Sequence, residues 1–371
     1  MQKKLNENQP PLFLWDVLKD SGKPIVMFGT GDGADKILAV MEKAELKPVC
    51  FTATGDFPMK SNFREWQVLS FEEVEKRYRD FVVLVCFGSA QPDVIERLNA
   101  LTEKYEVFAP DVPVAGTEIY TPEYVEKNAE KIDQVRKMFH DDKSREVFDR
   151  WLDYRLSGRL DFLEEIASPR SEILSLLKLT DNEVFIDAGA YKGDTVEEFL
   201  KATKNKFGKI IAIEPDNRNY IALRRKFYAY GSGLFVPLNA AAWSENEPVE
   251  FALKTGRAGV AAVAGKSADR NIRNVRIKQV NGVKIDTLCQ KENIEKVTCL
   301  KLDVEGAEAE AIRGAKSIIT RHRPKMLVSM YHRTEDMFEL PLLISSFYAR
   351  YKFYLRKTRC IPGWEFQLIV L

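Results

Sequence analysis

The stretch VFIDAGAYKGDTVEEF, residues 184–199, decides the fold, because it places glycines and acids between an apolar strand and a helix. Asp187 stands where the predicted strand ends, and the helix is predicted to begin at Asp194. Gly189 and Gly193 allow the backbone to turn tightly and to approach a ligand. The amides that open the helix are expected to receive a carboxylate or another anion. This turn therefore predicts a small-molecule site.

Strands and helices alternate on both sides of this stretch, which predicts an α/β fold with mainly parallel sheets. Two strands follow the last predicted helix, so the C-terminal Rossmann-like sheet is expected to be mostly parallel with an antiparallel edge. Residues 121–180 have helical spacing and few strand formers. We therefore predict a smaller N-terminal α/β domain over 1–120, a helical connector over 121–180 and the C-terminal domain over 181–371.

Composition excludes several function classes. The chain has 371 residues and a formal net charge of +1, which gives no electrostatic argument for nucleic-acid or membrane-surface binding. No apolar run approaches the ~20 residues of a membrane span, and the N-terminus lacks the apolar region of a signal peptide. The five cysteines show no pairing motif and are expected to be reduced core residues. Cytoplasmic residence is the prediction, and a homo-oligomer is left open.

Polar residues fall at the predicted carboxyl ends of the C-terminal strands, where open α/β sheets bind ligands. They are Asp187, Glu214, Asn239, Asp303 and His332. Glu214 lies 27 positions after Asp187 (214 − 187), the usual interval for an acid that binds ribose hydroxyls, so a nucleoside cofactor is expected.

NAD and S-adenosylmethionine both suit such a site. In the dinucleotide fingerprint the middle glycine admits a pyrophosphate, whereas GAYKG places Tyr191 near that position. A cofactor without a pyrophosphate is therefore favoured.

The motifs VFIDAGAYKGDT, IAIEPD, NAAAW, KIDTL and LKLDVEGAEAEAIRGA resemble those of FkbM-type S-adenosylmethionine-dependent methyltransferases, over roughly residues 184–371. MYHRTEDMFELP followed by YLRKT resembles a bacterial subset with an extra N-terminal α/β domain. The turn departs from the generic D-x-G-x-G-x-G pattern at Ala190 and Tyr191, which leaves the placement of the methionine end open. The resemblance implies O-methylation of a hydroxyl, typically on a sugar or a natural product.

Site residues follow from these arguments. S-adenosylmethionine is expected to contact the residues of three strand ends and their turns: Asp187, Gly189, Ala190, Gly193, Asp194, Thr195, Glu214, Pro215, Asn239, Ala240 and Asp303. For Asn239, a structural role in the turn is as well supported as contact with the adenine or ribose of the cofactor. The catalytic candidates are Asp303, His332 and Glu305, with His332 as a base of ordinary pKa near ~6.5.

Tyr331, His332 and Arg356 are expected to bind the acceptor. Arg356 would bind an acidic or phosphate-bearing acceptor, and the alternative is that it is an ordinary exposed arginine on a strand. No metal ligand is assigned, although Asp303, Glu305 and His332 converge and suit several divalent ions.

The N-terminal part contains a second glycine turn, VMFGTGDGADKI, with Gly29, Gly31 and Gly33, and Asp56 is a candidate ribose ligand. We expect it to bind a nucleotide-linked or lipid-linked sugar or another carrier, and a docking module is the equal alternative. Two other functions stay open for the whole chain: a non-catalytic sugar-pathway adaptor, and an NAD-dependent oxidoreductase acting through this turn.

Overall fold

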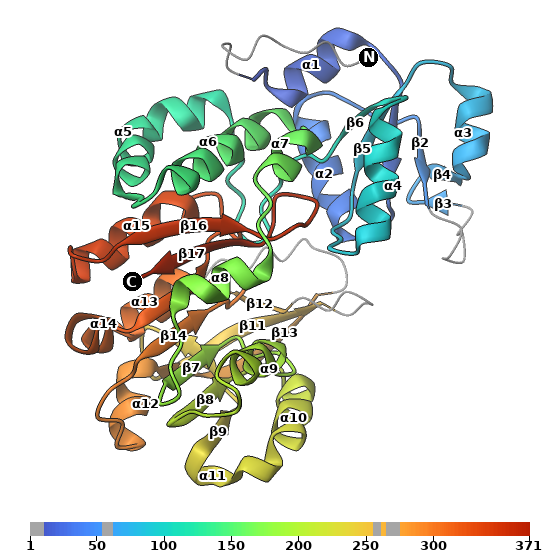
Figure 1. Ribbon diagram of the computed structural model, residues 1–371. Coiled ribbons are helices and arrows are strands. Elements are labelled where there is room, and N and C mark those ends of the chain that lie inside the picture. Colours follow the sequence, from blue (N-terminus) through green and yellow to red (C-terminus); the bar gives the residue numbers. More distant parts are fainter. Residues whose placement is uncertain (1–10, 54–61, 255–260, 265–274) are drawn as a thin grey trace.

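A computed structural model of the chain describes residues 11–53, 62–254, 261–264 and 275–371 (Figure 1). Over these ranges the chain is α/β with mostly parallel sheets, as predicted. All five cysteines are buried and free, which confirms the expectation of reduced core residues. Within the same ranges, no helix combines the length and the apolar character needed to cross a membrane.

The N-terminal sheet has six strands in the order β3-β4-β2-β1-β5-β6, and all neighbours are parallel except β3 and β4. Its central strands IVMF and VVLV are fully buried, as expected when helices cover both faces of a parallel sheet. The strands are β1 (Ile25–Phe28), β2 (Cys50–Thr52), β3 (Asn62–Phe63), β4 (Trp66–Leu69), β5 (Val82–Val85) and β6 (Glu106–Phe108). The helices are α1 (Leu14–Ser21), α2 (Asp32–Lys43), α3 (Phe71–Arg77) and α4 (Pro92–Thr102).

Helices follow over the predicted connector: α5 (Pro122–Met138), α6 (Asp142–Ser157), α7 (Leu160–Glu165) and α8 (Arg170–Leu177). The side chains of Thr121 and Asp141 cap α5 and α6 by accepting backbone N–H bonds. Figure 1 shows α5, α6 and α7 beside the last strands of the chain. The domain limits at 120 and 180 stay predictions.

The C-terminal sheet has seven strands in the order β16-β17-β15-β14-β7-β8-β9. β17 pairs antiparallel with both β15 and β16, which confirms the predicted antiparallel edge. The strands are β7 (Val184–Ala188), β8 (Lys209–Ile213), β9 (Phe235–Leu238), β14 (Cys299–Leu302), β15 (Lys325–Ser329), β16 (Phe353–Lys357) and β17 (Phe366–Val370). The helices are α9 (Asp194–Ala202), α10 (Asn217–Lys226), η1 (Tyr228–Tyr230), α11 (Gly231–Leu234), α12 (Ile285–Lys291), α13 (Glu308–Gly314), α14 (Lys316–His322) and α15 (Asp336–Phe347).

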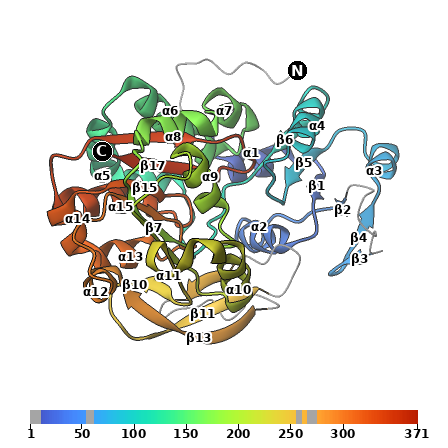
Figure 2. The same cartoon turned by 60° about the horizontal axis from the view of Figure 1, so that its bottom comes forward.

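A third, four-stranded sheet has the order β10-β13-β11-β12, and Figure 2 shows β11 and β13 along its lower side. Its strands are β10 (Ala241–Trp243), β11 (Pro248–Lys254), β12 (Ala261–Ala264) and β13 (Val275–Lys284). The stretch LFVPLNAAAW, residues 234–243, has the pattern of a single strand but is divided between two sheets, because β9 ends at Leu238 and β10 joins this other sheet. Asn239 and Ala240 make the crossing.

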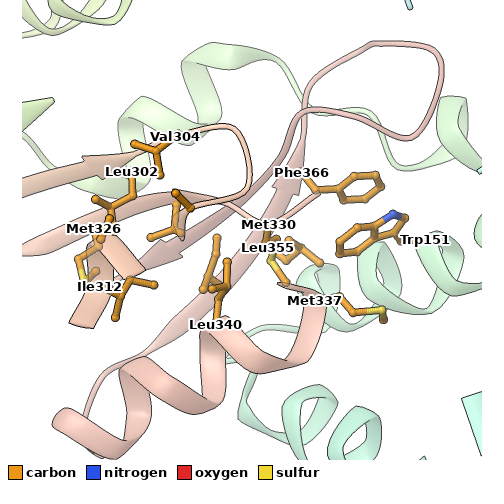
Figure 3. Packing of buried hydrophobic residues seen from close by; sticks show 14 of the residues in the cluster. Trp151, Leu302, Val304, Ile312, Met326, Met330, Met337, Leu340, Leu355 and Phe366 are labelled. Carbon is orange, nitrogen blue, oxygen red and sulfur yellow. The ribbon is translucent and has the colours of Figure 1, made fainter. Parts of the chain in front are cut away.

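One hydrophobic cluster runs through all three parts of the chain, and Figure 3 shows its portion between α6 and the C-terminal part. Trp151 of α6 stacks on Phe366 of β17 with ring centroids 4.0 Å apart and planes 14° apart. Leu302 and Met326 extend the same cluster into the C-terminal sheet, and Val83 extends it into the N-terminal sheet. The edge of the C-terminal sheet is therefore covered by the connector helices.

Candidate active site

The turn after β7 requires both of its glycines. Gly189 and Gly193 have φ values of 82° and 87°, in the left-handed region. A Cβ atom on Gly189 would lie 1.8 Å from the carbonyl oxygen of Asp303, and one on Gly193 would lie 2.2 Å from Cε2 of Phe227. The predicted tight turn is present, and it lies directly against the end of β14.

Hydrogen bonds tie this turn to the end of β8. The amides of Gly189 and Ala190 both donate to the carbonyl oxygen of Ile213, at 2.9 and 3.0 Å. The amide of Tyr191 donates to Oε2 of Glu214 at 2.8 Å. The turn and Glu214 are therefore held in one arrangement.

Glu214 is buried, and its carboxylate faces backbone donors. Its Oε1 accepts the amide of Asp216 at 2.8 Å, while Oε2 accepts that of Tyr191. Burial raises the pKa of Glu214 to about 7, and the two backbone hydrogen bonds only partly offset this effect. Because each carboxylate oxygen has two lone pairs, both oxygens retain acceptor capacity for a ligand hydroxyl.

Asn239, Pro215 and Ala240 shape the neighbouring strand ends. The side-chain amide of Asn239 donates to the carbonyl oxygens of Glu214 and Pro215 at 2.9 and 3.1 Å. Ala240 is buried. In this conformation the Asn239 side chain positions the loop that carries Glu214, which matches the turn role weighed in the sequence.

The start of α9 faces the same turn. Gly193 is the N-cap residue and has no side chain that could occupy the amides of the first turn, which begins with Asp194 and Thr195. The partial positive charge of a helix N-terminus favours an anionic ligand group. This arrangement suits the carboxylate expected from the sequence.

Asp187 and Asp303 are joined by Lys301, which is buried. The Lys301 ammonium lies 3.1 Å from Oδ1 of Asp187 and 3.5 Å from Oδ2 of Asp303, and it donates to the carbonyl oxygen of Gly189 at 2.8 Å. Both oxygens of Asp187 are buried and lack a hydrogen-bond partner, so the contact with Lys301 is an ion pair without hydrogen-bond geometry.

The pKa values in this chain of charges follow from burial and pairing. Burial raises the pKa of Asp187, and Lys301 only partly compensates. Burial also acts against the charge on Asp303, but Lys301 and His332 hold the pKa of its carboxyl below the ordinary value. Asp303 is therefore ionised at neutral pH, while its side chain remains 31% exposed.

His332 lies at the end of β15, surrounded by carboxylates. Its Nδ1 is 2.9 Å from Oε1 of Glu308, and its Nε2 is 3.6 Å from Oδ1 of Asp303 and 3.5 Å from Oε2 of Glu305. Glu308 also accepts the amides of Val304 and Gly306. The structure thus brings together all three predicted catalytic residues.

The expected ordinary pKa of His332 is wrong. Burial lowers the pKa of the imidazole, but the carboxylates of Glu308, Glu305 and Asp303 outweigh burial and raise it to about 10. At neutral pH this imidazole therefore keeps its proton. A role as a free general base is disfavoured in this arrangement.

Tyr331 and the chain leaving the N-terminal part border this cluster. The Tyr331 ring lies beside His332, with centroids 4.2 Å apart, and burial raises the pKa of its phenol well above the ordinary value. The amide of Ala115 donates to the carbonyl oxygen of His332 at 2.8 Å. Thr334 Oγ1 donates to the carbonyl oxygen of Glu118 at 2.5 Å.

Arg356 is not placed as predicted. It is 4% exposed, and its guanidinium pairs with Asp141 at 2.7 Å and with Glu172 at 2.6 Å, while it also donates to Ser144 Oγ at 2.9 Å. These partners lie before or within α6 and α8. The charge of Arg356 therefore serves to join β16 to the connector helices, and neither an acceptor-binding role nor an exposed position is supported.

The N-terminal glycine turn is present after β1. A Cβ atom on Gly33 would lie 2.3 Å from the carbonyl oxygen of Cys86, so close packing of α2 against the end of β5 requires this glycine. A Cβ atom on Gly31 would meet nothing within 4 Å, and Gly29 has a φ of 118°. Asp56 lies outside the described residues.

Sequence reasoning identified neither Glu308 nor Lys301 as a site residue. Both lie inside the quoted motif LKLDVEGAE. Glu308 is the first residue of α13 and is fully buried. Glu308 stands between two other glutamates, Glu305 and Glu310, and nothing in the local sequence marks it as buried. Only the fold therefore identifies its role.

Residues 187–354 match the family model of the methyltransferase FkbM domain, a segment that includes the β7 turn, Glu214 and the cluster around His332. This chain carries a methyltransferase FkbM domain. It is accordingly an S-adenosylmethionine-dependent methyltransferase. No curated protein matches the sequence significantly.

A solved methyltransferase FkbM from Methylobacillus flagellatus KT has a TM-score of 0.70 at 19% identity, covering 96% of this chain and 92% of that chain. The likeness establishes the fold across both α/β parts. The SAM-dependent methyltransferase of Aquifex aeolicus has a TM-score of 0.31 at 11% identity, covering 64% of this chain and 97% of that chain. The Streptococcus mutans protein SMU.1697c, solved with SAH, has a TM-score of 0.34 at 13% identity, covering 55% of this chain and 98% of that chain. The last two overlaps are too slight to describe this FkbM domain.

Proposed function

We propose that this methyltransferase methylates a hydroxyl group of a sugar, a glycan or a related metabolite. The single observation that supports the proposal most strongly is the meeting of the β7 turn with the acidic cluster, since the Gly189 position lies against the carbonyl of Asp303. A cofactor site and a set of proton acceptors thus adjoin at the ends of β7 and β14. Transfer between two bound reactants depends mainly on holding them close and aligned.

The chain's residues fit S-adenosylmethionine on the cofactor side. Glu214 would accept hydrogen bonds from the ribose hydroxyls, and the amides at Asp194 and Thr195 would face the carboxylate of the methionine part. Asp303, which is 31% exposed, would face the ammonium group, and the buried pair of Asp187 with Lys301 would hold the turn beside it. When bound, the cofactor supplies an electrophilic methyl group.

On the acceptor side, Asp303 and Glu305 are the groups that would orient the hydroxyl and take its proton. Their side chains are 31% and 33% exposed, so an acceptor can reach them. His332 holds its own proton at neutral pH because its pKa is about 10. It would act by keeping the two carboxylates in place, and Tyr331 would line the acceptor side beside it.

Calorimetry with S-adenosylhomocysteine tests the cofactor side. Binding to the full chain should fall at least tenfold in Glu214→Ala and stay unchanged in Glu245→Ala, an exposed acid that serves as the control. Tight binding of NAD instead would overturn the proposal in favour of an oxidoreductase.

Chemistry is tested separately, with labelled S-adenosylmethionine over a panel of sugar acceptors. Methyl transfer should be lost in Asp303→Ala and His332→Ala and kept in Glu310→Gln, a change in an acid that pairs with Arg313 on α13. Cofactor binding without transfer to any hydroxyl would favour a non-catalytic adaptor in a sugar-assembly pathway.

For the N-terminal part, we propose binding of a nucleotide-linked or lipid-linked sugar or a similar carrier at the turn of Gly29 and Gly31. The open space at Gly31 supports a ligand there. Gly33 does not, because the close packing of α2 against the end of β5 already explains why a glycine is needed at that position. Titration of the full chain with nucleotide sugars should show binding that Gly31→Val removes. No binding over a broad panel would favour a docking module.

A further inference from the structure

His332 Nε2 is a buried nitrogen without a hydrogen-bond partner. The residue is 1% exposed, and this atom points between Oδ1 of Asp303 and Oε2 of Glu305. Unpartnered buried polar atoms are rare in folded proteins, and each calls for an explanation such as an ion. The nitrogen thus indicates a ligand independently of the acidic residues around it.

The distances around Nε2 suit a metal ion better than hydrogen bonds. Nε2 lies 3.6 Å from Oδ1 of Asp303 and 3.5 Å from Oε2 of Glu305, beyond the ~2.7–3.2 Å of a hydrogen bond. Two ligands that each bind an ion at ~2.1 Å are separated by ~3.0 Å at a right angle and by ~3.4 Å at the tetrahedral angle. For each of these two pairs of atoms, a shift of a few tenths of an ångström reaches the separation of two metal ligands.

Glu308 has the position that commonly supports a metal-binding histidine. Metal-bound imidazoles usually donate their other ring nitrogen to a carboxylate, which fixes the tautomer and the ring orientation. Here Nδ1 lies 2.9 Å from Oε1 of Glu308, whose oxygens also accept the amides of Val304 and Gly306. With its oxygens so occupied, Glu308 is the orienting group.

Glu305 lies in the turn between β14 and α13, where its backbone has a φ of 56°, a left-handed conformation that non-glycine residues seldom adopt. Such local strain is frequent at ligand-binding positions. Asp303, Glu308 and His332 offer atoms that all lie within 4.8 Å of one another, and Oε2 of Glu305 adjoins this group at 3.5 Å from Nε2 of His332.

We propose that His332 Nε2, Asp303 and Glu305 bind one divalent metal ion, which displaces the proton that Nε2 carries in the metal-free chain, while Glu308 accepts the Nδ1 hydrogen bond and holds the imidazole. One imidazole and two carboxylates suit ions such as Mn²⁺ or Zn²⁺ rather than Mg²⁺, which prefers oxygen ligands alone. The exposed sides of Asp303 and Glu305 leave the ion open to a hydroxyl. An ion there would hold the acceptor hydroxyl and lower its pKa, and the carboxylate oxygens that do not bind the ion would take the proton, a role that rests on the proposed function.

Metal binding is tested on the full chain after EDTA treatment and dialysis, without cofactor or acceptor. Added Mn²⁺ is followed by the loss of its free-ion paramagnetic resonance signal, and Zn²⁺ by calorimetry. We expect one saturable site per chain for at least one of the two ions. Glu305→Gln and His332→Gln should each weaken it at least tenfold, and Glu310→Gln should leave it unchanged.

His332→Gln replaces a buried side chain and risks misfolding. Glu305→Gln is therefore the decisive variant for the metal site, because the Glu305 side chain is 33% exposed. Absence of saturable binding, or equal binding by wild type and Glu305→Gln, overturns the metal site. The proposed methyl transfer is judged separately, by the transfer of labelled methyl groups to sugar acceptors. A chain that binds S-adenosylhomocysteine and transfers methyl groups but binds no metal would sink this inference and leave the proposed function standing.

Discussion

Lys301 places its ammonium 3.1 Å from Oδ1 of Asp187, inside the sheet, where the two side chains are 6% and 0% exposed. The residues are neighbours across the parallel strands β7 and β14. The same ammonium also donates to the carbonyl oxygen of Gly189, so one cation holds both the end of the strand and the start of the turn. Its loss would affect the fold and the cofactor side together.

Replacing Lys301 by methionine should lower the free energy of unfolding by about 3–5 kcal/mol, because Asp187 would be left buried and uncompensated. Urea denaturation measures this change. The double variant with Asp187→Asn should recover most of the loss, since no buried charge then remains. A single variant as stable as wild type would show that the pair contributes nothing.

Gly189→Ala should abolish S-adenosylhomocysteine binding and destabilise the protein, because the added Cβ would lie 1.8 Å from the carbonyl oxygen of Asp303. The matched control is Gly231→Ala. Its φ of 70° is also left-handed, but a Cβ there meets nothing within 4 Å. The control should cost only about 1–2 kcal/mol of conformational strain and should keep binding. Equal behaviour of the two variants would contradict the contact at Asp303.

Glu214 should make stability depend on pH. Its pKa is about 7 in the folded protein, and in the unfolded chain it has the ordinary value of 4.5. Between these values the folded chain binds more protons than the unfolded chain, so stability falls as pH rises through the window. The difference amounts to roughly 3 kcal/mol and persists above pH ~7.

The comparison with Glu214→Gln isolates this effect from other titrating groups. Urea denaturation at a series of pH values measures the unfolding free energy of wild type and variant. From pH ~4.5 to ~7 the unfolding free energy of wild type should fall relative to that of the variant. A difference that stays constant over that interval would refute the raised pKa.

Arg356→Ala should reduce stability without changing the KM for an acceptor. Its removal takes hydrogen bonds from Asp141 and Glu172, which are 32% and 26% exposed, and Glu172 keeps its pair with Lys143, so the cost should be about 1.5–3 kcal/mol. Thermal melting and acceptor kinetics, once an acceptor is identified, separate the two roles. A rise in KM at unchanged melting temperature would restore the acceptor-binding interpretation.

Local patterns predicted those features that depend on neighbouring residues. The glycine turn, the acids at strand ends and the antiparallel edge all follow from spacing of a few residues, and the structure has them. Spacing does not predict the split between β9 and β10, because residues 234–243 have the pattern of one strand, while the fold pairs Ala241 with β13 of a different sheet.

The remaining features depend on contacts between distant residues. Arg356 meets Asp141 across 215 positions, and the imidazole of His332 meets three carboxylates whose joint effect moves its pKa. No single-residue preference encodes either result. The same holds for Lys301, whose importance appears only when β14 is paired with β7.

The main-chain hydrogen bond from the amide of Ala115 to the carbonyl oxygen of His332 joins the segment that follows the N-terminal sheet to the acidic cluster of the C-terminal part. A displacement at the N-terminal sheet would therefore be transmitted to the imidazole through main-chain atoms rather than through an adjustable side chain. Exchanging that part for the corresponding piece of a relative would consequently alter the catalytic half even where every catalytic residue was retained.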